Sequence, residues 1–108
     1  MVELKTLAKG STFRYEGSIK EGIRIMYGQL GFNTKVDKVI LNSMLKNFSN
    51  KTVLIDATRT KSNLKEGSLG QWLNNYLKTA VITSYVAAIL VHEGYAENHD
   101  KKLKFKDC

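Results

Sequence analysis

The chain has 108 residues, a formal net charge of +7 and no proline. A chain of this length forms one domain and can bury a core unaided, since 43% of its residues are apolar. Its one cysteine excludes an internal disulfide, and no apolar run approaches the ~20 residues of a membrane span. We therefore expect a cytoplasmic protein that has no membrane contact and whose positive charge favours anionic partners.

The N-terminal third is expected to contain one short strand and one helix. Residues 12–15 have strand propensity, which indicates a short strand or an extended arm. From Ser18 to Leu30, apolar residues recur at helical spacing, and Ser18 with Glu21 has the spacing of a capping box. Two glycines inside this stretch each disfavour a helix by about 1 kcal/mol. The spacing nevertheless predicts a helix over residues 18–30.

The middle of the chain is expected to continue with a helix, a strand and a loop. The helix is predicted from about Lys35 to Phe48, with Thr34 or Asp37 as its N-cap and residues 32–35 as the connector before it. The β-branched stretch 52–58 is predicted as a strand of a sheet that helices cover on at least one face. The polar residues that follow, up to Gly67, are expected to form a loop.

Residues 67–105 have the order helix, tight turn, helix and β-hairpin. Ser68 opens the first helix in a second capping box, and Trp72 is expected to anchor this helix in the core. The next helix is predicted from about Ala80 to Glu93. Lysines alternate with apolar residues over 102–106, which is typical of a half-exposed strand.

This part of the chain resembles the end of a winged-helix domain, in which a recognition helix is followed by a glycine, an aromatic residue and a charged two-stranded wing. Leu90, Gly94 and Tyr95 match that pattern, and Lys101 and Lys102 lie where the tip of the wing would be. The resemblance covers residues 67–106 and implies a DNA-binding helix-turn-helix.

The expected fold is a single small α+β domain, residues 1–108. It has about four helices and a short antiparallel sheet. Residues 1–58 provide helical support with a strand at 52–58, and residues 67–106 form the winged-helix-like part.

The sequence departs from a DNA-reading helix at one point. No lysine or arginine lies between Thr79 and Tyr95, whereas recognition helices use such residues, or Asn and Gln, to contact base edges. The predicted helix 80–93 would offer Thr83, Ser84 and His92 instead. We therefore do not expect this helix to read sequence directly.

Anion binding is expected elsewhere. Free amides at the start of a helix bind phosphate, and Ser68 begins a helix just after a basic loop. Ordinary capping by Ser68 is the alternative at that position. The residues expected to contact nucleic acid or another anion are Arg59, Lys61, Lys65, Ser68, Thr83, Ser84, Lys101, Lys102 and Lys104.

Neither a catalytic nor a metal site is indicated. The two histidines, His92 and His99, match no zinc spacing and are expected at the surface. The serines and Cys108 lack the context of a catalytic triad, and Glu66 lacks the lysine that a nuclease pattern places two residues later. We therefore expect a non-enzymatic protein without a cofactor.

Two functions remain open. One is a nucleic-acid-binding module, with DNA preferred over RNA, that holds phosphates on the basic loop and the lysine wing. The other is a small inhibitor or adaptor, such as an anti-defence protein of a mobile element, that captures an acidic protein or a nucleotide. Its contact surface would be the uncharged face of helix 80–93, including Ala87 and Ala88. A homodimer is compatible with either function.

Overall fold

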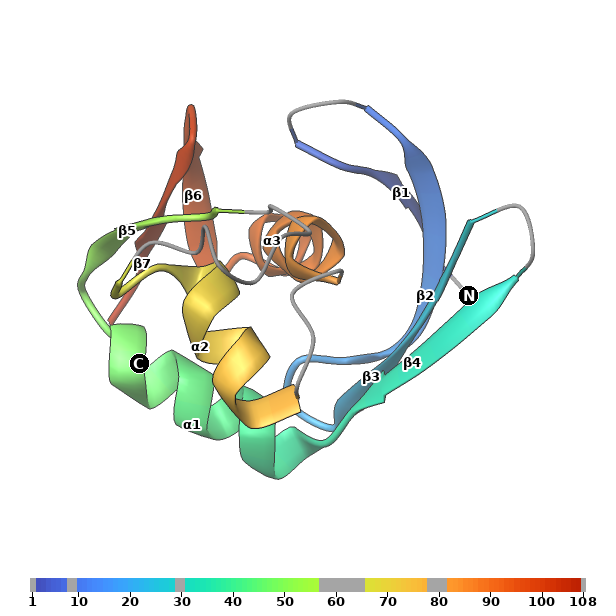
Figure 1. Cartoon of the computed structure of the whole chain (residues 1–108), viewed down its shortest axis with the longest axis horizontal. Coiled ribbons are helices and arrows are strands. Elements are labelled where there is room, and N and C mark those ends of the chain that lie inside the picture. The colour runs from blue at the N-terminus through green and yellow to red at the C-terminus, as the bar shows by residue number, and fades with distance from the viewer. Residues whose placement is uncertain (1, 8–9, 29–30, 57–65, 78–81, 108) are drawn as a thin grey trace.

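Two antiparallel sheets lie on either side of helix α3 (Thr83–His92) in the computed structural model (Figure 1). The structure describes residues 2–7, 10–28, 31–56, 66–77 and 82–107. Within these ranges it has three helices and seven strands. The expected α+β class is confirmed, but the described ranges contain three helices rather than about four. No helix in them is long and apolar enough to cross a membrane.

The N-terminal sheet, sheet A, is an antiparallel meander that curves around α3 (Figure 1). Its strand order is that of the chain: β1 (Val2–Lys5), β2 (Thr12–Ser18), β3 (Gly22–Tyr27) and β4 (Phe32–Val36). Side chains alternate between the two faces of each strand, and the buried positions on β2 and β3 are apolar or aromatic. These buried side chains are Phe13, Tyr15, Ile23 and Ile25.

The predicted helix over residues 18–30 is wrong, because its described residues, 18–28, contain the end of β2, the β2–β3 turn and strand β3. Gly17 and Gly22 have φ angles of +92° and +107°, which a helix does not contain. The Ser18 hydroxyl does accept a hydrogen bond from the Glu21 amide, at 3.1 Å, but it closes a tight turn instead of capping a helix. Residues 32–35 are also corrected, since they belong to β4 and not to a connector.

Helix α1 (Lys38–Phe48) confirms the second predicted helix. Asp37, one of the two expected N-caps, accepts a hydrogen bond from the Val39 amide at 3.0 Å. The apolar face of α1 is buried. Its fully covered members are Leu41, Met44, Leu45 and Phe48.

Sheet B contains the C-terminal hairpin and has the strand order β5-β7-β6. Its strands are β5 (Thr52–Leu54), β6 (Ala96–His99) and β7 (Lys102–Phe105). Strand β5 ends earlier than the predicted 52–58, while the predicted hairpin is confirmed. Phe105 at the end of β7 stacks on Phe48 of α1 at a centroid distance of 5.1 Å, which joins sheet B to the helical part of the core.

Helix α2 (Leu69–Leu77) begins with the capping box expected from the sequence. The Gln71 amide donates to Ser68 Oγ at 3.1 Å, and the Gln71 side chain accepts from the Gly67 amide at 2.8 Å. Helix α3 follows and is buried along nearly its whole length. It ends as predicted before Gly94, whose φ of +85° favours glycine.

One polar contact joins sheet A to the end of α3. Glu93 follows the last residue of the helix and accepts hydrogen bonds from the Tyr15 hydroxyl at 2.7 Å and the Ile19 amide at 3.0 Å. Tyr15 is only 2% exposed. Burial, reinforced by the hydrogen bond to Glu93 and its charge, raises the pKa of Tyr15 well above the ordinary value for a phenol.

Gly17→Ala should prevent stable folding. A Cβ at this position would collide with the carbonyl oxygen of Gly22 across the β2–β3 turn. Gly10→Ala is the matched control, because Gly10 also has a positive φ but has open space around it. We expect Gly10→Ala to lower the free energy of unfolding by about 1 kcal/mol and Gly17→Ala by at least about 3 kcal/mol. Urea unfolding measures both values, and equal losses would contradict the packing argument.

Alkaline pH should destabilise the protein through Tyr15. The contribution of the neutral phenol is fully present below the unfolded pKa of about 10 and decreases as the pH rises above it, because the unfolded chain then binds fewer protons than the folded one. The free energy of unfolding should decrease more steeply between pH 9 and 11 in the wild type than in Tyr15→Phe. Parallel pH profiles in urea unfolding would show that Tyr15 is not the responsible group.

Candidate nucleic-acid interface

The outer face of sheet B gathers lysines. The register pairs Lys102 with Leu54 and His99, and pairs Lys104 with Thr52 and Glu97, so both lysines point to the same face. Both are exposed, whereas Leu103 and Phe105 on the opposite face are buried. Lys101 in the turn and Lys106 after β7 are also exposed. We call these four lysines the lysine face.

The hairpin that carries the lysine face is fixed by backbone contacts. Asp100 adopts a φ of +61° in the β6–β7 turn, a conformation that Asp tolerates better than most residues. The Ile55 amide donates to the Lys101 carbonyl at 3.0 Å, which attaches the tip of the hairpin to the end of β5. These contacts set the position of the turn that carries the charged side chains.

Acidic residues limit the charge of this surface. Glu97 lies opposite Lys104, and His99 Nε2 is 3.6 Å from Glu97 Oε2. Asp100 and Asp107 flank the lysines in the chain. The surface therefore has mixed charge and is not a continuous positive patch.

The helix N-terminus expected to bind phosphate is already occupied by the chain itself. Ser68 is 1% exposed, and its hydroxyl accepts a hydrogen bond from the Gln71 amide. The Gly70 amide donates a hydrogen bond to the Ile55 carbonyl at 3.0 Å. Ordinary capping, the alternative reading of Ser68, is what the structure has. The basic residues expected beside it, Arg59, Lys61 and Lys65, lie outside the described residues.

The face of α3, predicted as helix 80–93, that was expected to be exposed is buried. Thr83 and Ala87 of α3 are fully buried, and Ala88 is 4% exposed. Ser84 is partly buried, and His92 is exposed at the end of the helix. Because these side chains are buried, both the contact expected from Thr83 and the expected small-residue docking surface are corrected.

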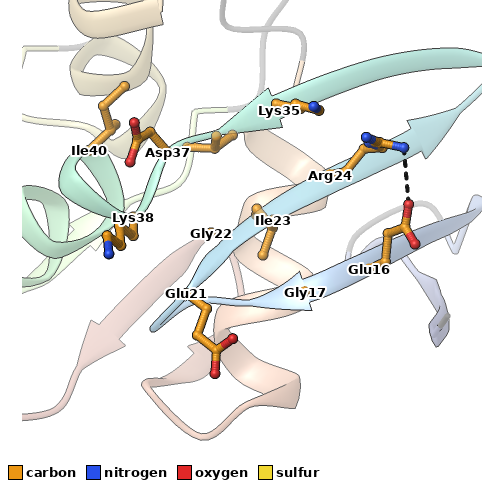
Figure 2. A pocket seen from close by; sticks show the side chains of 11 residues that line it. Glu16, Gly17, Glu21, Gly22, Ile23, Arg24, Lys35, Asp37, Lys38 and Ile40 are labelled. Carbon is orange, nitrogen blue, oxygen red and sulfur yellow. Dashed lines mark hydrogen bonds and ion pairs between the residues drawn. The ribbon is translucent and has the colours of Figure 1, made fainter.

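A cavity of about 770 Å³ lies on the outer side of sheet A, where the β2–β3 turn meets the start of α1 (Figure 2). Figure 2 shows Glu16 and Arg24 pointing toward each other from β2 and β3, with an ion pair of 3.3 Å between them. Three carboxylates and three cations line the cavity, so it has no net preference for anions. These are Glu16, Glu21, Asp37, Arg24, Lys35 and Lys38.

The sequence did not indicate this cavity, because it depends on the wrongly predicted segment 18–30. The paired glycines Gly17 and Gly22, both with positive φ, were the available signal for a turn. Because its positive and negative charges are equal in number, the cavity does not indicate a particular class of ligand.

The described residues contain no group of three or more His, Cys, Asp or Glu that could hold a metal ion. Comparisons with protein-family models, curated proteins and solved structures give no match. Functional interpretation therefore depends on the surfaces of this chain alone.

Ala87→Arg should unfold the protein and not merely remove a contact. A guanidinium at this fully buried position has no room and no partner. We expect a loss of at least about 4 kcal/mol in the free energy of unfolding, whereas Ser84→Arg on the same helix should cost far less because Ser84 is partly exposed. If Ala87→Arg melts like the wild type, the burial of Ala87 in the core is wrong.

Proposed function

We propose that the protein is a non-enzymatic nucleic-acid-binding module that holds phosphates on the lysine face. The observation that carries the proposal is the placement of Lys102 and Lys104 on one exposed face, with Lys101 and Lys106 beside them. Lysine ammonium groups bind phosphates as point charges, and the net charge of +7 attracts a polyanion from a distance. A cytoplasmic location without a cofactor belongs to the same proposal.

A winged-helix-like character of residues 67–106 is part of this proposal. The order of α2, α3 and the β6–β7 hairpin is the order that the resemblance requires. In that arrangement the hairpin is the wing and its lysines follow the nucleic-acid backbone. Sheet A is not part of the winged-helix pattern. It packs on α3, the helix that in that pattern would enter a groove of the nucleic acid.

The proposed binding is therefore led by phosphates. With α3 covered, the side chains of this helix are not available to read bases. Contacts to phosphates position a protein on nucleic acid but carry no sequence information directly. We expect weak dependence on sequence and a steep decrease of affinity with salt, as counterion release requires.

The alternative is that the same lysines capture an acidic protein. The lysines of β7, with Glu97 and Asp100 in the same hairpin, would also suit a partner of mixed charge. Absorbance of the purified protein is the first discriminator. A ratio at 260 to 280 nm well above that of clean protein supports nucleic acid, and a clean ratio together with no binding to oligonucleotides supports the acidic protein.

Charge reversal on the lysine face should abolish nucleic-acid binding. The variant Lys102→Glu/Lys104→Glu adds repulsion from phosphates, while its exposed positions should change the free energy of unfolding by only about 0.5 kcal/mol. Lys5→Glu/Lys20→Glu is the matched control, because both lysines are exposed near sheet A and the net charge falls equally from +7. Fluorescence anisotropy with labelled duplex and single-stranded oligonucleotides measures affinity.

Neutralisation gives an independent measurement of the same contacts. Lys102→Gln/Lys104→Gln should reduce the slope of log affinity against log salt by about two units if each lysine holds one phosphate. An unchanged slope, or equal losses in the Lys5/Lys20 control, would place the binding surface elsewhere.

A further inference from the structure

Helix α2 has an unusual outer surface for a charged protein. A quarter of all residues in the chain are charged, yet the nine residues of α2 include none. Its inward side is apolar, with Leu69 and Leu73 fully buried. Its outward side carries aromatic rings and amides in place of the charges that exposed helix faces usually have. These outward residues are Gln71, Trp72, Asn75 and Tyr76.

Two of these residues form a stacked aromatic pair at the surface. The rings of Trp72 and Tyr76 are 4.2 Å apart between centroids, with an interplanar angle of 27°. Trp72 is partly buried against the core and meets Phe48 edge-on at 6.3 Å, so the ring beneath Tyr76 is held in place. Tyr76 is 58% exposed, and exposed Asn75 beside it offers an amide donor and acceptor.

The aromatic pair is connected to the lysine face through the core. Trp72 contacts Phe48, and Phe48 stacks on Phe105 at 5.1 Å. Phe105 lies between Lys104 and Lys106 in the chain. The rings thus form a continuous row from the surface at Tyr76 to the lysine-bearing strand. Small domains hold single strands of roughly 4–16 nucleotides, and the proposal requires such a strand to pass over the surface from Tyr76 to the lysine face.

We propose that Tyr76, supported by Trp72, is a stacking site for an unpaired base of a single-stranded nucleic acid whose phosphates lie on the lysine face. This inference rests on the proposed function. A flat aromatic ring binds any base through its π-face, and Asn75 can contact the edge of that base. In a duplex the bases are stacked on each other and are not available to Tyr76. The net charge of +7 favours an anionic partner, and single-stranded nucleic acid combines that charge with unpaired bases.

The test compares oligonucleotides with and without bases. The probes are a 12-nucleotide thymidine oligomer and an abasic oligomer with the same phosphates, both in the same buffer at low salt. Trp72 is the only tryptophan, so its fluorescence reports on this surface directly. We expect the thymidine oligomer to quench this fluorescence and to bind more tightly than the abasic oligomer, which should leave the fluorescence unchanged.

Tyr76→Ala should weaken binding of the thymidine oligomer by about tenfold, within the range reported for loss of one stacked base. Its binding of the abasic oligomer should stay within about twofold of the wild type, because the phosphate contacts remain. Phe32→Ala is the matched control, since Phe32 on β4 is an aromatic residue 54% exposed. It should change neither affinity. Tyr76→Phe keeps the ring and should restore binding and quenching.

The outcomes separate this inference from the function on which it rests. If both oligomers bind equally and neither quenches Trp72, the stacking site is wrong and the lysine face stands. If neither oligomer binds, the proposed function fails as well. Quenching by a neutral oligosaccharide with no quenching by the thymidine oligomer would assign the aromatic pair to a sugar and overturn the inference. Thermal unfolding of Tyr76→Ala confirms that the exposed substitution leaves the fold intact.

Discussion

The enclosure of α3 is the constraint on which the other elements depend. From Thr83 to Val91 the helix has no charged side chain, and seven of its residues are buried. Such a helix must be covered on more than one side. Sheet A covers one side, and α2 with sheet B covers the other (Figure 1). The small side chains of Ala87 and Ala88 leave room for close packing.

Glu93 gives this enclosure a directional polar contact. A carboxylate after the last turn of a helix gains nothing from the helix dipole, whose negative end lies there. Its two hydrogen bonds from Tyr15 and Ile19 compensate for that position, and both donors belong to sheet A or its turn. Hydrophobic burial alone would allow sheet A to shift on α3. The pair of hydrogen bonds fixes where the β2–β3 turn lies against the helix end.

The sequence correctly predicted the elements for which the capping residues and the spacing of apolar residues indicate the same structure. Asp37 and α1, the capping box of α2, and the glycine after α3 were all recognisable, because one or two neighbouring residues determine each of them. Residues 18–30 were mispredicted because Ile19 and Ile23 fit two patterns. With Met26 they match a helical stripe, and with Ile25 they match the alternation of a strand. Only the partner strand decides between them, and the sequence alone does not show it.

The candidate site was predictable only where residues close together in the chain determine it. The lysines of β7 alternate with buried residues along one strand, so their common face follows from the sequence. The burial of Thr83 and the hydrogen bond from the Gly70 amide to the Ile55 carbonyl depend on residues that are distant in the chain, and no local pattern shows them. A helix without charge was compatible with a free docking face and with a covered core. The two possibilities differ only in whether another element packs on the helix.

The position of sheet A limits which surfaces of the C-terminal half can contact a partner. In the arrangement that residues 67–106 resemble, one helix reads bases while the wing holds phosphates. Here the helix is enclosed, while the lysines of β7 and Tyr76 of α2 are exposed. Lysines contact a backbone regardless of sequence, and aromatic rings contact bases regardless of identity. If the proposed function holds, a fold that covers α3 gives up sequence selection but keeps both kinds of contact that an unpaired strand offers.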